Sequence, residues 1–69
     1  MRVNCICPGF VETEWQKKKP AEIRASIESK IALHRFATPE EIAHLTCAVL
    51  ENPYVNGSII NVDGGYCYK

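Results

Sequence analysis

Two short stretches of the chain carry the hydrophobic patterns of β-strands. The apolar run from Arg2 to Cys7 stops at Pro8-Gly9, which predicts a largely buried strand of a parallel sheet, ended by a turn. The alternating apolar positions of Ser58 to Val62 predict a second strand. Asp63-Gly64-Gly65 follows it as a turn, in which we expect the aspartate to hydrogen-bond nearby backbone groups.

A helix with one apolar side is predicted after Pro20. Ile23, Ile27 and Ile31 recur at a spacing of four residues, which places them on the same side of a helix. Before this helix, the stretch from Phe10 to Lys19 mixes aromatic, acidic and basic side chains without a period. We therefore expect an irregular lid there.

A second helix has a clear start and a clear stop. Thr38-Pro39-Glu40-Glu41 combines a threonine cap, a proline in the first turn and a glutamate at the capping-box position. The helix is expected to end near Leu50, because Pro53 forbids its continuation. Its predicted core-facing residues are Ile42, Leu45, Thr46 and Val49.

The order strand, lid helix, helix, strand predicts an α/β fold in which a right-handed crossover joins two parallel strands. Two strands alone leave long apolar edges unpaired. The segment is therefore expected either to belong to a larger sheet or to pair with copies of itself.

Composition and charge narrow the classes of function. The 69 residues allow at most one domain, and eight basic residues balance eight acidic ones, so no overall field favours nucleic acid or an anionic membrane. Lys17-Lys18-Lys19 is either a solvated surface run or a contact for an acidic ligand. The chain lacks an apolar run of bilayer length and a signal peptide, so we expect a cytoplasmic location.

The cysteines are expected to be structural. Cys5 and Cys7 lie two apart in an apolar run, so they share one strand face and are predicted to be small buried hydrophobes. Cys47 falls in the second helix, where burial is also expected. A metal-dependent regulator would need Cys5, Cys7 and a histidine, His34 or His44. This set lacks Cys-x-x-Cys spacing, so no metal site is predicted. The fourth cysteine is Cys67.

Three blocks of residues carry a resemblance to a known family. They are Arg2-Val3-Asn4 with Pro8-Gly9 and Thr13, then Arg35 with Pro39-Glu40-Glu41-Ile42-Ala43, then Gly57 with Ile60-Asn61-Val62-Asp63-Gly64-Gly65. In this order and spacing they resemble the last third of short-chain dehydrogenases/reductases, and most of all 3-oxoacyl-acyl-carrier-protein reductases. The resemblance implies that residues 1–69 form a single partial domain, the carboxy-terminal segment of a doubly wound Rossmann-type sheet.

The resemblance also implies a cofactor site beyond the first strand. In the family this turn holds the nicotinamide amide of NAD or NADP, and Phe10 and Trp15 here fall on the mobile substrate lid. Without the family, Pro8-Gly9 ends a strand, Thr13 caps the lid, and Trp15 packs on a partner or stays exposed. The residues that match the family's cofactor contacts are Pro8, Gly9, Val11 and Thr13.

Other family motifs are missing from the chain. The Gly-rich pyrophosphate loop, the Asn-Ala-Gly turn and the catalytic Ser with Tyr-x-x-x-Lys have no counterpart; Tyr54, Tyr66 and Tyr68 are not followed by a lysine four residues later. We therefore expect no catalytic residue here, a parent that uses NAD or NADP, and a chain that binds neither by itself.

The last strand and second helix correspond to a subunit interface of the family, which implies a homo-oligomer. The alternative function is a non-enzymatic, self-associating structural module. It is motivated by the unpaired strand edges.

Overall fold

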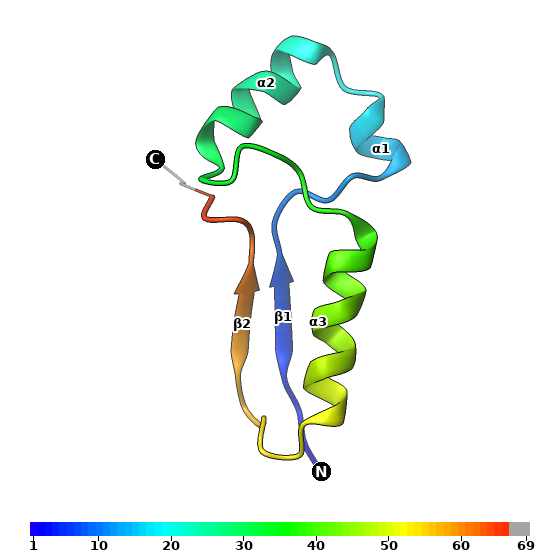
Figure 1. Ribbon diagram of the computed structural model, residues 1–69, viewed down its shortest axis with the longest axis vertical. Helices are drawn as coiled ribbons and strands as arrows, with labels where there is room; N and C mark the ends of the chain where they lie inside the picture. The colour runs from blue at the N-terminus through cyan, green and yellow to red at the C-terminus, as the bar shows by residue number, and fades with distance from the viewer. Residues whose placement is uncertain (67–69) are drawn as a thin grey trace.

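The computed structural model describes residues 1–66, so Cys67, Tyr68 and Lys69 lie outside the described residues. Strands β1 (Cys5–Pro8) and β2 (Ile59–Val62) form a parallel two-stranded sheet (Figure 1). Its register pairs Cys5 with Ile59 and Pro8 with Val62. The predicted α/β order of strand, lid, helix and strand is confirmed.

Strand β1 begins three residues later than predicted because side chains interrupt the backbone ladder at its start. The N–H of Val3 donates to Oδ1 of Asn56 at 3.1 Å, and the N–H of Ser58 donates to Oδ1 of Asn4 at 3.0 Å. These bonds stand in for two of the N–H to C=O pairs of a regular sheet, although the N–H of Gly57 still donates to the C=O of Val3 at 2.8 Å. Residues 2–4 therefore run beside the segment that precedes β2 without forming a regular strand pair with it.

Helix α3 (Pro39–Glu51) runs beside β1 (Figure 1). The capping box is present, since the hydroxyl of Thr38 accepts from the N–H of Glu41 while the Glu41 carboxylate accepts from the N–H of Thr38. The helix ends one residue later than predicted, at the residue before Asn52. Its predicted core-facing side is confirmed: Val49 is buried, and Ile42, Leu45 and Thr46 are half-buried.

Helices α1 (Glu14–Lys17) and α2 (Ala21–Lys30) lie beyond the carboxyl ends of both strands (Figure 1). The single turn of α1 falls in the stretch predicted to be irregular. The apolar side predicted for α2 is only partly buried. Ile23 is 49% exposed and Ile27 is half-buried, whereas Ile31, just past the helix, is only 2% exposed. The lid therefore packs on the rest of the chain mainly through its carboxyl end.

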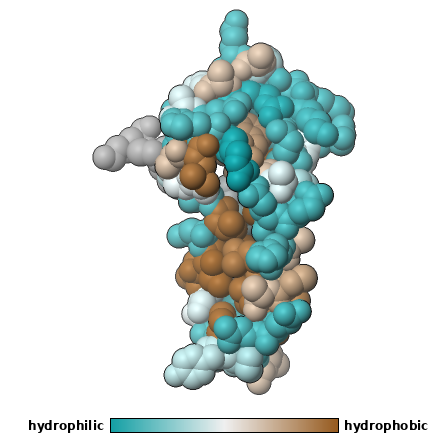
Figure 2. Space-filling view, in the orientation of Figure 1, coloured by the Kyte–Doolittle hydropathy of each residue, from teal (hydrophilic) through white to brown (hydrophobic). Residues whose placement is uncertain are grey.

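The core is small for a chain of this length. Within residues 1–66 the buried apolar side chains are Ile31, Phe36 and Val49. Ile59 is 75% exposed, and Figure 2 shows apolar surface over the two strands. No helix in the described part of the chain is long and apolar enough to cross a membrane.

The burial predicted for the cysteines is wrong. Cys5 and Cys47 are exposed, and Cys7 is half-buried. Ile6 lines a groove with Thr46 and Val49 of α3, so the helix covers the opposite face of β1 from the one that carries the two strand cysteines. Nothing in the described chain covers that second face, which explains the exposure of Cys5.

Candidate functional site

The candidate site lies where the chain leaves the two strands. Residues 9–13 follow β1, residues 63–66 follow β2, and the loop of residues 31–38 crosses between the lid and α3. Ligands of open α/β sheets bind beyond the carboxyl ends of the strands. The structure thus brings the four predicted cofactor-contact residues to the expected edge of the sheet.

Gly9 is held against the end of the second strand. Its N–H donates to the C=O of Val62 at 3.1 Å. A Cβ at this position would lie 2.8 Å from Cβ and 2.9 Å from Cα of Asp63, closer than side-chain atoms approach. The chain's own packing therefore requires the glycine, whether or not a ligand approaches this turn. Pro8 precedes it as the last, exposed residue of β1.

The residues on either side of Val11 form hydrogen bonds with Ala37 of the crossing loop. The N–H of Ala37 donates to the C=O of Phe10 at 2.9 Å, and the N–H of Glu12 donates to the C=O of Ala37 at 2.7 Å. In this parallel bridge, the N–H and C=O of Val11 itself point to the opposite side. Among residues 1–66, no hydrogen bond uses either group. Val11 therefore offers one donor and one acceptor side by side.

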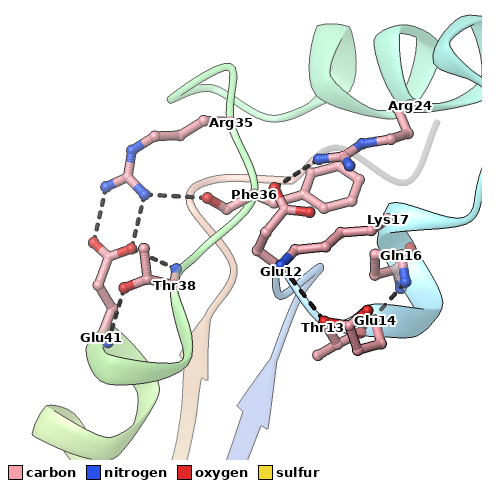
Figure 3. A network of polar contacts seen from close by, with 10 residues as sticks. All are labelled: Glu12, Thr13, Glu14, Gln16, Lys17, Arg24, Arg35, Phe36, Thr38 and Glu41. Carbon is pink, nitrogen blue, oxygen red and sulfur yellow. Dashed lines mark hydrogen bonds and ion pairs between the residues drawn. The ribbon is translucent and has the colours of Figure 1, made fainter.

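Thr13 caps the short helix α1. Its Oγ1 accepts a hydrogen bond from the N–H of Gln16 at 3.4 Å, and the side chain is exposed (Figure 3). Thr13 therefore caps the lid, which is the role expected for it without the family. It uses one lone pair of the hydroxyl and leaves the O–H free to donate.

Phe10 packs inside the lid. Its ring centroid lies 5.6 Å from that of Phe36 and 5.4 Å from that of Tyr66. The ammonium of Lys19 lies 5.4 Å from the Phe10 ring centroid, within range of a cation–π contact. Lys19 is therefore not simply part of a solvated run. These contacts tie the lid to the turn after β2.

Glu12 and Arg24 join the lid helix to the turn after β1. Arg24 Nη2 donates to Oε2 of Glu12 at 2.6 Å, and the guanidinium lies 4.7 Å from the ring centroid of Phe36 (Figure 3). No local pattern in the sequence predicts this pair, because the two residues are twelve positions apart. The ion pair and the aromatic ring together fix α2 over the site.

Trp15 stays at the surface of the lid. Its side chain is 74% exposed and borders a surface hollow of about 220 Å³ with Lys18, Lys19 and Pro20. Lys17 forms an ion pair with Glu14. The Trp15 side chain therefore lies mostly in solvent.

A bidentate ion pair fixes the start of α3 at the edge of the site. Arg35 donates to both carboxylate oxygens of Glu41, at 2.7 and 2.8 Å, and to the C=O of Phe36 at 3.1 Å (Figure 3). The hydrogen bond from Arg35, with a further one from the backbone of Thr38, lowers the pKa of Glu41 to about 2. The carboxylate of the capping box therefore stays charged in mildly acidic solution.

Asp63-Gly64-Gly65 forms the predicted turn. Oδ1 of Asp63 accepts from the N–H of Gly65 at 3.0 Å, which confirms the aspartate as a turn former. Gly65 has φ +82°, and a Cβ there would lie 2.8 Å from Cβ of Ala32. The turn therefore packs directly on the loop that follows α2.

The cavity among these segments is small. A pocket of about 90 Å³ opens between the aromatic ring of Phe10, the Arg35–Glu41 pair and the turn at Asp63. Ligand pockets for small molecules are typically about 300–1,000 Å³. The described residues thus provide one wall of a ligand site rather than an enclosure.

Comparison with known proteins fits this arrangement. A family model described as enoyl-(acyl carrier protein) reductase matches residues 1–67. The chain belongs to the short-chain dehydrogenase/reductase family. It is 45% identical over 67 residues to the 3-oxoacyl-[acyl-carrier-protein] reductase of Thermotoga maritima, covering 94% of this chain and 27% of that protein. The human 3-oxoacyl-[acyl-carrier-protein] reductase is 40% identical, with 94% and 26% covered.

Solved structures of short-chain dehydrogenases confirm the Rossmann-type fold. A 3-hydroxyacyl-CoA dehydrogenase type-2 from Mycobacterium avium superposes with a TM-score of 0.91 at 32% identity, covering 99% of this chain and 27% of the other. A small-chain dehydrogenase in complex with NADPH gives a TM-score of 0.78 at 30% identity, with 94% and 32% covered. The chain spans about a quarter of the length of the curated relatives it matches.

Proposed function

We propose that this chain forms the nicotinamide-facing, carboxy-terminal part of an NAD(P)-dependent oxidoreductase that acts on a carbonyl or alcohol. The observation that carries the proposal is the free N–H and C=O of Val11 beyond the carboxyl end of β1. A carboxamide needs one acceptor for its N–H and one donor for its C=O. Val11 supplies both from a single residue held by the Ala37 bridge.

The other predicted contacts divide into two groups. Thr13 keeps an O–H donor after capping α1, and Pro8 is exposed beside the turn, so both fit a bound nicotinamide end. Asp63 occupies the space that a side chain at Gly9 would need, so this glycine does not by itself indicate a bound ligand. A bound dinucleotide would supply the hydride chemistry. The role proposed for these residues is to bind and orient its amide.

The chain is proposed to be inactive without further protein. The 69 residues contain no Tyr-x-x-x-Lys sequence, which is the catalytic pair of the family, and the pocket at the site has a volume of only about 90 Å³. A nicotinamide dinucleotide needs contacts to its adenosine, pyrophosphate and nicotinamide parts together for tight binding. Residues 8–13 supply contacts for the last of these three.

An NMR titration of the isotopically labelled chain with NADPH and NADH tests the proposal, with an absorbance assay for turnover alongside. We expect no turnover, no saturation at concentrations that saturate complete reductases, and weak amide shifts confined to residues 9–13. The nicotinic acid analogue of the dinucleotide is the matched control, since it lacks the amide N–H, and it should shift these residues less. Turnover, or shifts scattered over the chain, would contradict the proposal.

A second candidate function, self-association as a structural module, is favoured by the open side of the sheet. Each strand has one unpaired edge in the described structure, and Ile59 of β2 is 75% exposed. Leu50 near the end of α3 is 68% exposed. Pairing of two copies through β2 and α3 would cover both residues, giving the homo-oligomer expected from the family.

Light scattering after gel filtration tests this association. The chain is expected to elute as a dimer or larger assembly, and Ile59→Lys should shift it toward the monomer by placing a charge on the contact. Lys30→Met, on the exposed end of α2, serves as the control variant and should leave the assembly unchanged. A folded monomer at high concentration would rule out the module.

A further inference from the structure

A closed ring of contacts links the lid helix α2 to both sides of the Ala37 bridge. Glu12 follows Val11 in the chain, and its N–H donates to the C=O of Ala37 at 2.7 Å. The Glu12 carboxylate accepts at Oε2 from Nη2 of Arg24 on α2, at 2.6 Å. The Arg24 guanidinium in turn lies 4.7 Å from the ring centroid of Phe36, the residue before Ala37 (Figure 3). One side chain of the lid therefore holds both segments that form the bridge.

These contacts lie within the chain and not on a face of the sheet. The side chains of Arg24 and Glu12 are 23% and 34% exposed. Phe36 belongs to the small core. All three lie beyond the carboxyl ends of the strands, the edge at which open α/β sheets bind their ligands (Figure 1). The ring of contacts therefore does not depend on what covers the two faces of the sheet.

The Glu12 carboxylate depends on Arg24 for its position. Its second oxygen, Oε1, is buried and has no hydrogen-bond partner among residues 1–66. A partly buried carboxylate that loses its cation is left poorly solvated, so the side chain must turn toward water. Glu12 lies between Val11 and Thr13, so this movement would also shift the backbone of the proposed amide site.

We propose that Arg24 is a positioning residue for the nicotinamide end of the dinucleotide. It acts through Glu12 and Phe36, and it fixes the direction in which the free N–H and C=O of Val11 point. The inference rests on the function proposed above for Val11. The lid helix thereby gains a role in cofactor orientation that is separate from any contact between the lid and a substrate.

A purely structural role for Arg24 would have a different consequence. The N–H of Gly9 donates to the C=O of Val62 in a neighbouring contact that Arg24 does not touch. General loosening of the chain would free the N–H of Gly9 together with the N–H groups of Glu12 and Ala37. Loss of positioning alone would free the last two and leave Gly9 protected.

Amide hydrogen exchange of the labelled chain, followed by NMR without any ligand, tests the positioning. Arg24→Met keeps an apolar stem beside Phe36 but removes the donor to Glu12. The N–H groups of Glu12 and Ala37 are expected to exchange at least about tenfold faster, since a hydrogen bond to a charged group contributes at least that factor. Equal acceleration at Gly9, or no acceleration at Glu12 and Ala37, would overturn the proposal.

Two further variants serve as rescue and control. Arg24→Lys keeps the charge but not the planar fork, so it should restore part of the protection of Glu12 and Ala37. Lys18→Met removes an exposed positive charge from the same lid and should leave the exchange of both N–H groups unchanged. If Lys18→Met accelerates them as much as Arg24→Met does, the effect comes from the charge of the lid, and Arg24 has no positioning role.

Titration of the same variants with NADPH and with its nicotinic acid analogue connects the positioning to the amide. In the wild-type chain, NADPH should shift residues 9–13 more than the analogue does, and Arg24→Met should lose this difference. A wild-type chain that shows no difference overturns the function proposed for Val11, and the role of Arg24 toward the dinucleotide with it. A difference that persists at full size in Arg24→Met overturns the role of Arg24 alone.

Discussion

Replacing Gly9 with alanine is expected to lower the free energy of unfolding by about 1–3 kcal/mol, the usual effect of overpacking. The new Cβ would lie 2.8 Å from Cβ and 2.9 Å from Cα of Asp63, so the ends of β1 and β2 must move apart. A chain of this length has a stability on the order of 5 kcal/mol. Urea unfolding followed by circular dichroism should show a clearly lower midpoint.

Gly57→Asn is the matched control for this substitution. Gly57 also has no side chain, but nothing lies within 4 Å of the place of a Cβ, and its φ of +68° is one that asparagine tolerates. Its midpoint should change much less than that of Gly9→Ala. If both variants unfold at the wild-type midpoint, the close contact with Asp63 has no part in stability.

Replacing Arg2 with methionine is expected to destabilise the chain by about 1.5–3 kcal/mol, the range for hydrogen bonds to charged groups. The guanidinium donates to four carbonyls near the carboxyl end of α3, one of which, that of Val55, also accepts from Nδ2 of Asn4 at 3.1 Å. Methionine keeps an apolar stem but leaves these acceptors and the negative end of the helix dipole without a cation. The acceptors are the C=O groups of Val49, Asn52 and Val55, at 3.2, 3.0 and 2.9 Å, and of Leu50, at 2.8 Å.

Thermal unfolding by calorimetry measures this loss, and two further variants separate geometry from charge. Arg2→Lys restores the charge but not the planar fork, so it should recover only part of the stability. Lys30→Met removes one positive charge from the exposed end of α2 and should change stability by less than about 1 kcal/mol. An Arg2→Lys variant as stable as the wild type would show that charge alone acts here.

The features that the sequence predicted well depend on neighbouring residues. The capping box joins Thr38 to Glu41, three positions away, and the turn joins Asp63 to Gly65, two positions away. Local chemistry decides both, whatever the rest of the chain does. The helix start and the last turn were therefore placed correctly from residue types alone.

The features that the sequence did not predict depend on distant parts of the chain. Burial of Cys5 depends on whether anything covers its face of the sheet, which a run of apolar letters cannot reveal. The contacts of Arg2 join residues at least 47 positions apart, and no periodicity records them. At the site, the position of Val11 followed from the family pattern. Its free N–H and C=O became visible only with the Ala37 bridge.

The pairing of β1 with β2 also sets when this fold can form. Cys5 meets Ile59, 54 positions later, so the sheet closes only after nearly the whole chain is available. Contacts between residues this distant in sequence slow folding, because loop closure precedes any gain from pairing. Helix α3 has its cap within its own first turn and can form earlier. During synthesis, β1 therefore leaves the ribosome before β2 and cannot form this pairing until β2 has emerged.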